Sequence, residues 1–245
     1  MSGSGENIAT KSKWKSPDKF FPIVVDNFFE DPLSVMDMGH RVPKETVGNQ
    51  PGLRSKQFWE IDQILHNAII KKALGCYFDL DYVNLTWKLS NMNFHEMSAE
   101  DGKGWIHQDN IVQNAGADNE LAGLIYLTPI ISYNSGTSLF TLKDGAVVRP
   151  EEETKQAGWQ EHRDKFNEKF RFENVFNRLI MYDAKEWHAA TEYVDNRLTL
   201  AFFIGGIEGV EFPRQRISRE DNIIEARIGK SSQLNQQNRI YSNVK

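Results

Sequence analysis

The 245-residue sequence predicts one mainly β domain with flanking helices, whose core is a double-stranded β-helix, or jelly roll. Two observations favour this class. Helical patterns come first and end near Gly75. From residue 84 onward, short segments of alternating apolar and polar residues are separated by Gly, Asn and Asp. A hydrophobic content of 40% is enough for one substantial core, which favours a single domain.

The N-terminal third begins with a polar, lysine-rich arm over residues 1–18. Residues 21–25 are apolar and are predicted to be the first strand. Asp31 followed by Pro32 supplies a capping side chain and a proline at the first helical position, which predicts a helix over 32–38.

A second helix is indicated before Gly75, because apolar residues there recur at helical spacing and a glycine then ends the pattern. These residues are Ile61, Ile64, Leu65 and Ala68. The period-two segments that follow are expected to be strands of one barrel-like sandwich, with His107 and Asp109 at one end of it. They cover residues 84–95, 122–128, 137–141, 179–182 and 197–204.

A charged stretch over residues 142–176 interrupts the strand series and carries several aromatic residues. We expect it to be an insertion carrying a helix. It is interpreted either as a solvated helix that packs its aromatics on the barrel or as a lid over the substrate. The predicted domain covers 19–210. The composition of the polar tail over 211–245 is not enough to assign a partner to it.

Composition excludes several classes of protein. The net charge of −5 and pI of about 5.7 make nucleic acid an unlikely partner. The single cysteine, Cys76, excludes an intramolecular disulfide and is expected to be a buried structural thiol. The sequence shows neither a signal peptide nor an apolar run long enough for a membrane span, so a soluble cytoplasmic protein is expected.

Four polar residues suggest a metal centre. His107 and Asp109 are two positions apart and share a face of an extended segment, while His188 and Arg197 lie far downstream. Two histidines and one carboxylate form the facial triad that binds non-haem Fe(II) and leaves open positions for dioxygen and a bidentate co-substrate.

Arg197 and Thr199 share a face of the predicted strand over 197–204, so both can bind one carboxylate. Each residue also has a simpler interpretation. A His-x-Asp pair occurs by chance, His188 could be a satisfied core histidine, and Arg197 could begin a strand at its solvated end. The combination favours a site.

These residues and the segments between them resemble the Fe(II)/2-oxoglutarate-dependent dioxygenases, particularly the branch like prolyl 4-hydroxylases. The resemblance extends from about Phe21 to Ile204 and agrees in order and spacing. The matching segments are 107–110 (HQDN), 123–128 (GLIYLT), 136–140 (GTSLF), 177–183 (NRLIMYD), His188 and 197–199 (RLT).

The resemblance implies a cupin-like jelly roll, with Fe(II), 2-oxoglutarate and dioxygen as cofactor and co-substrates. By residue-by-residue carry-over it implies iron ligands at His107, Asp109 and His188, and 2-oxoglutarate contacts at Arg197, Thr199 and Tyr126.

One departure concerns a tyrosine that such hydroxylases often have about ten residues before the first histidine. Met97 stands at that position here, with Asn93 and His95 nearby as candidates for the missing 2-oxoglutarate contact. A turn-capping role for Asn93 is the alternative.

The resemblance implies a hydroxylase of a C–H bond in a peptidyl or free amino acid, or in another small molecule. Family halogenases lack the carboxylate that Asp109 provides, and nucleic-acid demethylases often have an arginine where this chain has Phe203. Two alternatives remain: a catalytically silent jelly-roll binding or structural protein, and a zinc hydrolase. The sequence predicts neither the substrate nor the oligomeric state.

Overall fold

The computed structural model describes residues 20–47, 51–78, 86–101, 104–109, 119–129, 132–148 and 158–207. The predicted N-terminal arm and C-terminal tail lie outside these ranges.

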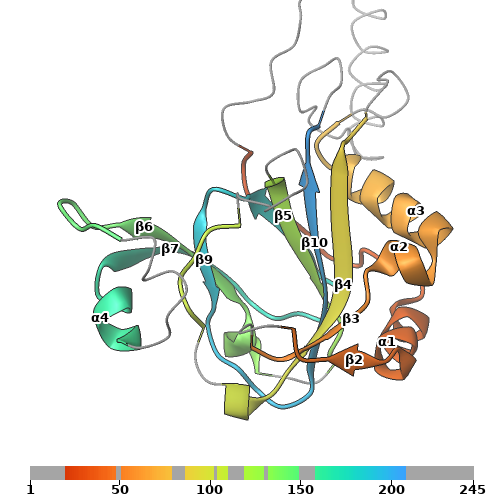
Figure 1. The fold of residues 1–245 in the computed structure, drawn as a ribbon, viewed down its shortest axis with the longest axis horizontal. Helices are drawn as coiled ribbons and strands as arrows, with labels where there is room; N and C mark the ends of the chain where they lie inside the picture. The colour runs from red at the N-terminus through yellow and green to blue at the C-terminus, as the bar shows by residue number, and fades with distance from the viewer. Residues whose placement is uncertain are drawn as a thin grey trace, which may run out of the picture.

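Two antiparallel sheets form the body of the fold (Figure 1). The larger has seven strands in the order β1 (Ile23–Val25), β8 (Leu179–Asp183), β5 (Asn119–Tyr126), β10 (Arg197–Gly205), β4 (Leu89–Met97), β3 (Leu53–Ser55) and β2 (Lys44–Glu45). The smaller has three, in the order β7 (Phe166–Phe172), β6 (Thr137–Leu142) and β9 (Trp187–Ala190). All the pairings are antiparallel, which confirms the predicted mainly β sandwich.

Each of the five predicted strand segments contains a strand, with residues 84 and 85 outside the described ranges. The sequence analysis did not predict β2, β3, β7 or β9.

Three helices cover the outer face of the larger sheet: α1 (Pro32–Arg41), α2 (Phe58–Ile61) and α3 (Gln63–Leu74) (Figure 1). Asp31 caps α1 as predicted, accepting a hydrogen bond from the Ser34 amide at 3.1 Å. The second predicted helix is divided at Asp62, whose side chain caps α3 by accepting from the Leu65 amide at 2.9 Å.

The alternation of side chains along β10 separates the core from the site. Leu198, Leu200 and Phe202 point to the helices and join the main apolar core. Arg197 and Thr199 therefore point to the opposite face, toward the smaller sheet.

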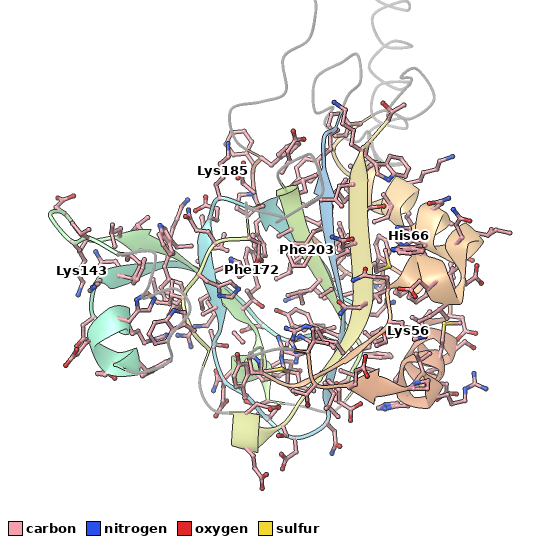
Figure 2. The ribbon with its side chains drawn as sticks, in the orientation of Figure 1. Lys56, His66, Lys143, Phe172, Lys185 and Phe203 are labelled. Atoms are coloured by element: carbon pink, nitrogen blue, oxygen red, sulfur yellow. The ribbon has the colours of Figure 1, made fainter. Side chains whose placement is uncertain are left out.

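A second apolar cluster lies between the two sheets, because it combines residues of β5 and β8 with residues of β6 and β7. Figure 2 shows two of its members, Phe172 and Phe203, in this space, and His66 on the helix side of the larger sheet. The interior between the sheets is where the predicted site residues meet.

The stretch over 142–176 carries a helix, as expected, but also a strand that was not predicted. Its described part contains one five-residue helix, α4 (Trp159–Arg163), and the strand β7, which pairs with β6 along the smaller sheet. Cys76 is partly exposed rather than buried, since it follows the end of α3. Among the described helices, none combines the length and apolarity needed to cross a membrane.

Candidate metal and co-substrate site

His107, Asp109 and His188 come together as predicted, each offering one ligand atom within 4.8 Å of the others. His107 Nε2 lies 3.5 Å from Asp109 Oδ1, and His188 Nε2 lies 2.9 Å from Asp109 Oδ2. Ligands about 2.1 Å from a divalent ion and at right angles to each other are separated by about 3 Å. These spacings therefore fit one ion bound by all three side chains.

Backbone hydrogen bonds hold this arrangement. The His107 amide donates to the His188 carbonyl at 3.0 Å, and the His188 amide donates back to the His107 carbonyl at 2.9 Å. Directly opposed residues of an antiparallel pair point to the same side, so this bridge places both imidazoles on one face. The Asp109 amide is held separately, by the Ala184 carbonyl at 2.9 Å.

Both imidazoles are oriented for binding through Nε2. His107 Nδ1 lies 2.7 Å from the Trp105 carbonyl oxygen, and His188 Nδ1 lies 3.1 Å from that of Glu186. A carbonyl only accepts, so each Nδ1–H donates there and leaves Nε2 as the atom that would bind a metal ion.

The charge of Asp109 favours a cation beside it, either a metal ion or a protonated His188. Burial opposes ionisation of Asp109, but the neighbouring His188 and His107 outweigh it and lower its pKa to about 2. Burial likewise lowers the pKa of His188, yet the Asp109 carboxylate raises it above its usual value. The side chain of His107 is 42% exposed and that of His188 is 7% exposed, so the site opens to solvent beside His107.

Helix α4 packs against the segment that carries His107. Trp159 Nε1 donates to the Gly104 carbonyl at 3.0 Å, and His162 Nε2 lies 2.7 Å from the Ile106 carbonyl oxygen. The His162 ring stacks on Trp105 with centroids 4.1 Å apart.

The other side of this segment lies against β9. A Cβ atom on Gly104 would lie 2.0 Å from the Ala190 carbonyl oxygen, so only glycine allows this approach. The segment from Gly104 to His107 is thus held between α4 and β9.

Arg197 is buried, with 3% of its surface exposed. Its Nε donates to the Ser135 carbonyl at 2.8 Å, and its guanidinium carbon lies 5.6 Å from the centroid of the Tyr126 ring. The Tyr126 hydroxyl donates to Thr137 Oγ1 at 3.1 Å. No carboxylate among the described residues pairs with Arg197, which leaves a desolvated cation between the sheets.

Tyr182 lies between the metal ligands and this arginine. Its ring centroid is 4.9 Å from that of His188, and its charge interactions reach both Asp109 and Arg197. The triad and the buried cation therefore share one interior.

The remaining predicted contacts lie beside Arg197. The Thr199 hydroxyl donates a long hydrogen bond to the His95 carbonyl oxygen at 3.4 Å. Burial lowers the pKa of His95 to about 4, and its Nε2 lies 2.9 Å from the Pro51 carbonyl oxygen. When neutral His95 donates its Nε2–H to Pro51, its Nδ1 is only an acceptor. A carboxylate is also an acceptor, so it would not form a hydrogen bond with Nδ1. Asn93 lies opposite Ala201 of β10, on the same face as His95.

Sequence reasoning missed Arg54 and Tyr193. Charge interactions connect Arg54 with Asp109 and His95, and connect Tyr193 with Arg197 and Arg54. Arg54 lies in a three-residue strand and Tyr193 lies in the connection between β9 and β10, so neither belongs to a period that a sequence pattern could show.

Comparisons with known proteins show the fold. No protein-family model and no curated protein matches the chain. HygX from Streptomyces hygroscopicus, solved with nickel, 2-oxoglutarate and hygromycin B bound, is similar at a TM-score of 0.50 and 12% identity, covering 75% of this chain and 82% of HygX.

Two further solved structures are similar at lower scores. A prolyl-4-hydroxylase from Pseudomonas putida has a TM-score of 0.42 and 11% identity, covering 75% of this chain and 91% of that one. A 2OG-Fe(II) oxygenase family oxidoreductase from Burkholderia pseudomallei has a TM-score of 0.44 and 12% identity, covering 80% and 87%. The similarity to HygX supports the predicted double-stranded β-helix fold.

Proposed function

We propose that this chain is a non-haem iron oxygenase that couples the oxidative decarboxylation of 2-oxoglutarate to the hydroxylation of a C–H bond. The substrate is a peptidyl or free amino acid or another small molecule. The observation that carries the proposal is a complete two-histidine, one-carboxylate triad that shares an interior with a buried arginine for which the described residues supply no carboxylate partner.

The triad would hold Fe(II) through His107 Nε2, His188 Nε2 and Asp109. Bound iron would supply the activation of dioxygen and the chelation of 2-oxoglutarate. The presence of Asp109 leaves one fewer position for an added halide, which supports hydroxylation or a related oxidation.

Arg197 would bind the distal carboxylate of 2-oxoglutarate. A buried cation without an acidic partner costs stability, so its retention is best explained by an anion that binds there. Two other side chains would complete the carboxylate site. The Tyr126 ring lies beside Arg197, and the Thr199 hydroxyl lies two residues further along β10 on the same face.

The apolar cluster between the sheets would exclude water from the reaction. Leu139 and Tyr126 are fully buried, Tyr182 is 3% exposed, and the Tyr182 ring contacts that of His188. A dry interior strengthens the pairing of Arg197 with its carboxylate. Asn93 and His95 remain weaker candidates for the same pocket, because the His95 N–H is used by Pro51.

HygX binds nickel and 2-oxoglutarate, which is consistent with a metal and co-substrate pair on this fold. The proposed location is the cytoplasm, where a reducing environment keeps iron as Fe(II). The net charge of −5 gives no electrostatic case for nucleic acid as the main partner.

The binding order tests the proposal. Under anaerobic conditions with Mn(II) in place of Fe(II), titration calorimetry should show one metal per chain, and 2-oxoglutarate should bind only after the metal. A silent jelly-roll binding protein would bind neither, and a zinc hydrolase would bind metal without gaining affinity for 2-oxoglutarate. Either result would contradict the proposal.

A further inference from the structure

Arg54 continues a row of pocket residues across four strands of the larger sheet. It pairs with His95 across β3 and β4, His95 pairs with Thr199 across β4 and β10, and Thr199 pairs with Tyr126 across β10 and β5. Opposed residues share a face, so all four face the interior between the sheets. Strands are spaced by about 4.8 Å, which places the Arg54 backbone about 10 Å from Thr199.

Arg54 has no acidic partner among the described residues. Its guanidinium donates a long hydrogen bond from Nη1 to the Pro51 carbonyl oxygen at 3.5 Å. The side chain is half-buried, and burial lowers its pKa. The loop before it is fixed by the Gly52 amide, which donates to Asp101 Oδ1 at 3.0 Å.

The guanidinium lies within electrostatic reach of the metal site. Its charge contributes to lowering the pKa values of Asp109, His95 and His107. Tyr193 lies in the same space, and burial raises its pKa, so its phenol remains a neutral hydrogen-bond donor. Arg54 is thus a second cation beside this site, and both arginines have charge interactions with His95 and Tyr193.

The charge of the loaded site rests on the proposed function. When Fe(II) and 2-oxoglutarate are bound, the charges of the metal, the co-substrate, Asp109, Arg197 and Arg54 sum to one positive charge. Asp109 and the two carboxylates of 2-oxoglutarate would neutralise Fe(II) and Arg197. Among the described residues, Arg54 would remain without a carboxylate at salt-bridge distance in a partly desolvated space, a position that an anionic group of the substrate would stabilise.

We propose that Arg54 binds a carboxylate of the substrate and orients the substrate for hydroxylation. A single negative charge fits the balance better than a phosphate, which carries about two at neutral pH. The planar guanidinium offers paired N–H donors to a carboxylate, and Tyr193 offers a further donor. The substrate class is accordingly a small molecule with a free carboxylate, rather than an internal residue of a peptide with an uncharged side chain.

Matched acid and amide probes test this proposal. Each proteinogenic L-amino acid and its primary amide would be compared for stimulation of 2-oxoglutarate decarboxylation by the Fe(II)-loaded full chain. The acid should be preferred, and Arg54→Met should reduce that preference by about tenfold or more, as expected for a hydrogen bond to a charged group. Arg41→Met, at the exposed end of α1, is the matched control and should retain the preference. Equal stimulation by acids and amides overturns the proposal.

If no amino acid or amide stimulates decarboxylation, a measurement of carboxylate binding at Arg54 tests the proposal instead. In 15N-labelled protein loaded with Zn(II) and 2-oxoglutarate, acetate should produce a saturable shift of the Arg54 Nε–H resonance, assigned by its loss in Arg54→Lys. A resonance that does not respond to acetate overturns the proposal.

Measuring the affinity for 2-oxoglutarate shows whether a negative result overturns the role of Arg54 or the proposed function itself. With Mn(II), 2-oxoglutarate binding should be weakened far less by Arg54→Met than by Arg197→Met. An equal loss would make Arg54 a co-substrate ligand and would overturn the substrate assignment alone. Failure of the wild-type protein to bind 2-oxoglutarate would overturn the proposed function itself.

Discussion

Replacing Arg197 by methionine should weaken 2-oxoglutarate binding without unfolding the protein. The guanidinium is 3% exposed and has no carboxylate partner among the described residues, so an incoming distal carboxylate would form a fully desolvated ion pair. Leaving one member of such a pair alone costs about 3 kcal/mol or more, which is over about a hundredfold in affinity.

The same substitution should have little effect on the metal-free protein. It removes the hydrogen bond to the Ser135 carbonyl, worth about 1 kcal/mol, but also removes a desolvated charge. The free energy of unfolding should therefore change by about 1 kcal/mol or less. A loss of several kcal/mol would instead show that Arg197 stabilises the fold, which would refute the reasoning.

Anaerobic calorimetry with Mn(II) measures the binding, and denaturant unfolding measures the stability. Thr199→Val provides the matched comparison, because it removes one hydroxyl from the same face of β10 and should cost about tenfold or less. Unchanged 2-oxoglutarate affinity in a folded Arg197→Met variant would show that the arginine does not bind the co-substrate.

Three further predictions concern the metal centre. His188→Ala removes one of the three ligands and should abolish most Mn(II) affinity in calorimetry, so a folded variant with full affinity would refute the metal assignment. His162→Phe keeps an aromatic ring beside Trp105 but loses the hydrogen bond to the Ile106 carbonyl, and should weaken Mn(II) binding by about tenfold, whereas unchanged affinity would limit α4 to packing. Gly104→Ala introduces a Cβ 2.0 Å from the Ala190 carbonyl oxygen and should destabilise the protein by about 1–3 kcal/mol, a cost that urea unfolding would detect or exclude.

The pairing of His107 with Asp109 was predictable because the two residues are close in sequence. His107 and Asp109 share a face of any extended segment, and the sequence names the ligand types directly. Their approach to His188 depends on a single backbone bridge between distant segments, which no local pattern shows. The resemblance to a known family supplied that long-range relation.

Strand prediction succeeded for the alternating β10 and failed for β7 and β3. β10 alternates over nine residues, with its apolar positions facing the helices. β7 is buried only at Phe166 and Phe172, its two ends, so its charged middle resembles a solvated segment. β3 has three residues, which is too few for any period, and the pocket cation Arg54 was missed with it.

The helix prediction shows the same limit. The pattern from Ile61 to Ala68 correctly indicated helix, but it could not show that the Asp62 side chain caps α3 and separates it from α2. Likewise, the aromatic residues of 142–176 indicated packing against the barrel. Only the structure shows that Trp159 and His162 contact the carbonyls of the segment bearing His107.

Conversion of 2-oxoglutarate to succinate tests the central claim most directly. The full-length chain should produce succinate in the presence of Fe(II) and dioxygen, at a basal rate even without added substrate. Zn(II) in place of Fe(II), or the His188→Ala variant with Fe(II), should produce none above background. Succinate formation that is equal with Zn(II) and Fe(II), or absent from the Fe(II)-loaded wild-type protein under every condition, would contradict the assignment of this site as an iron and 2-oxoglutarate centre.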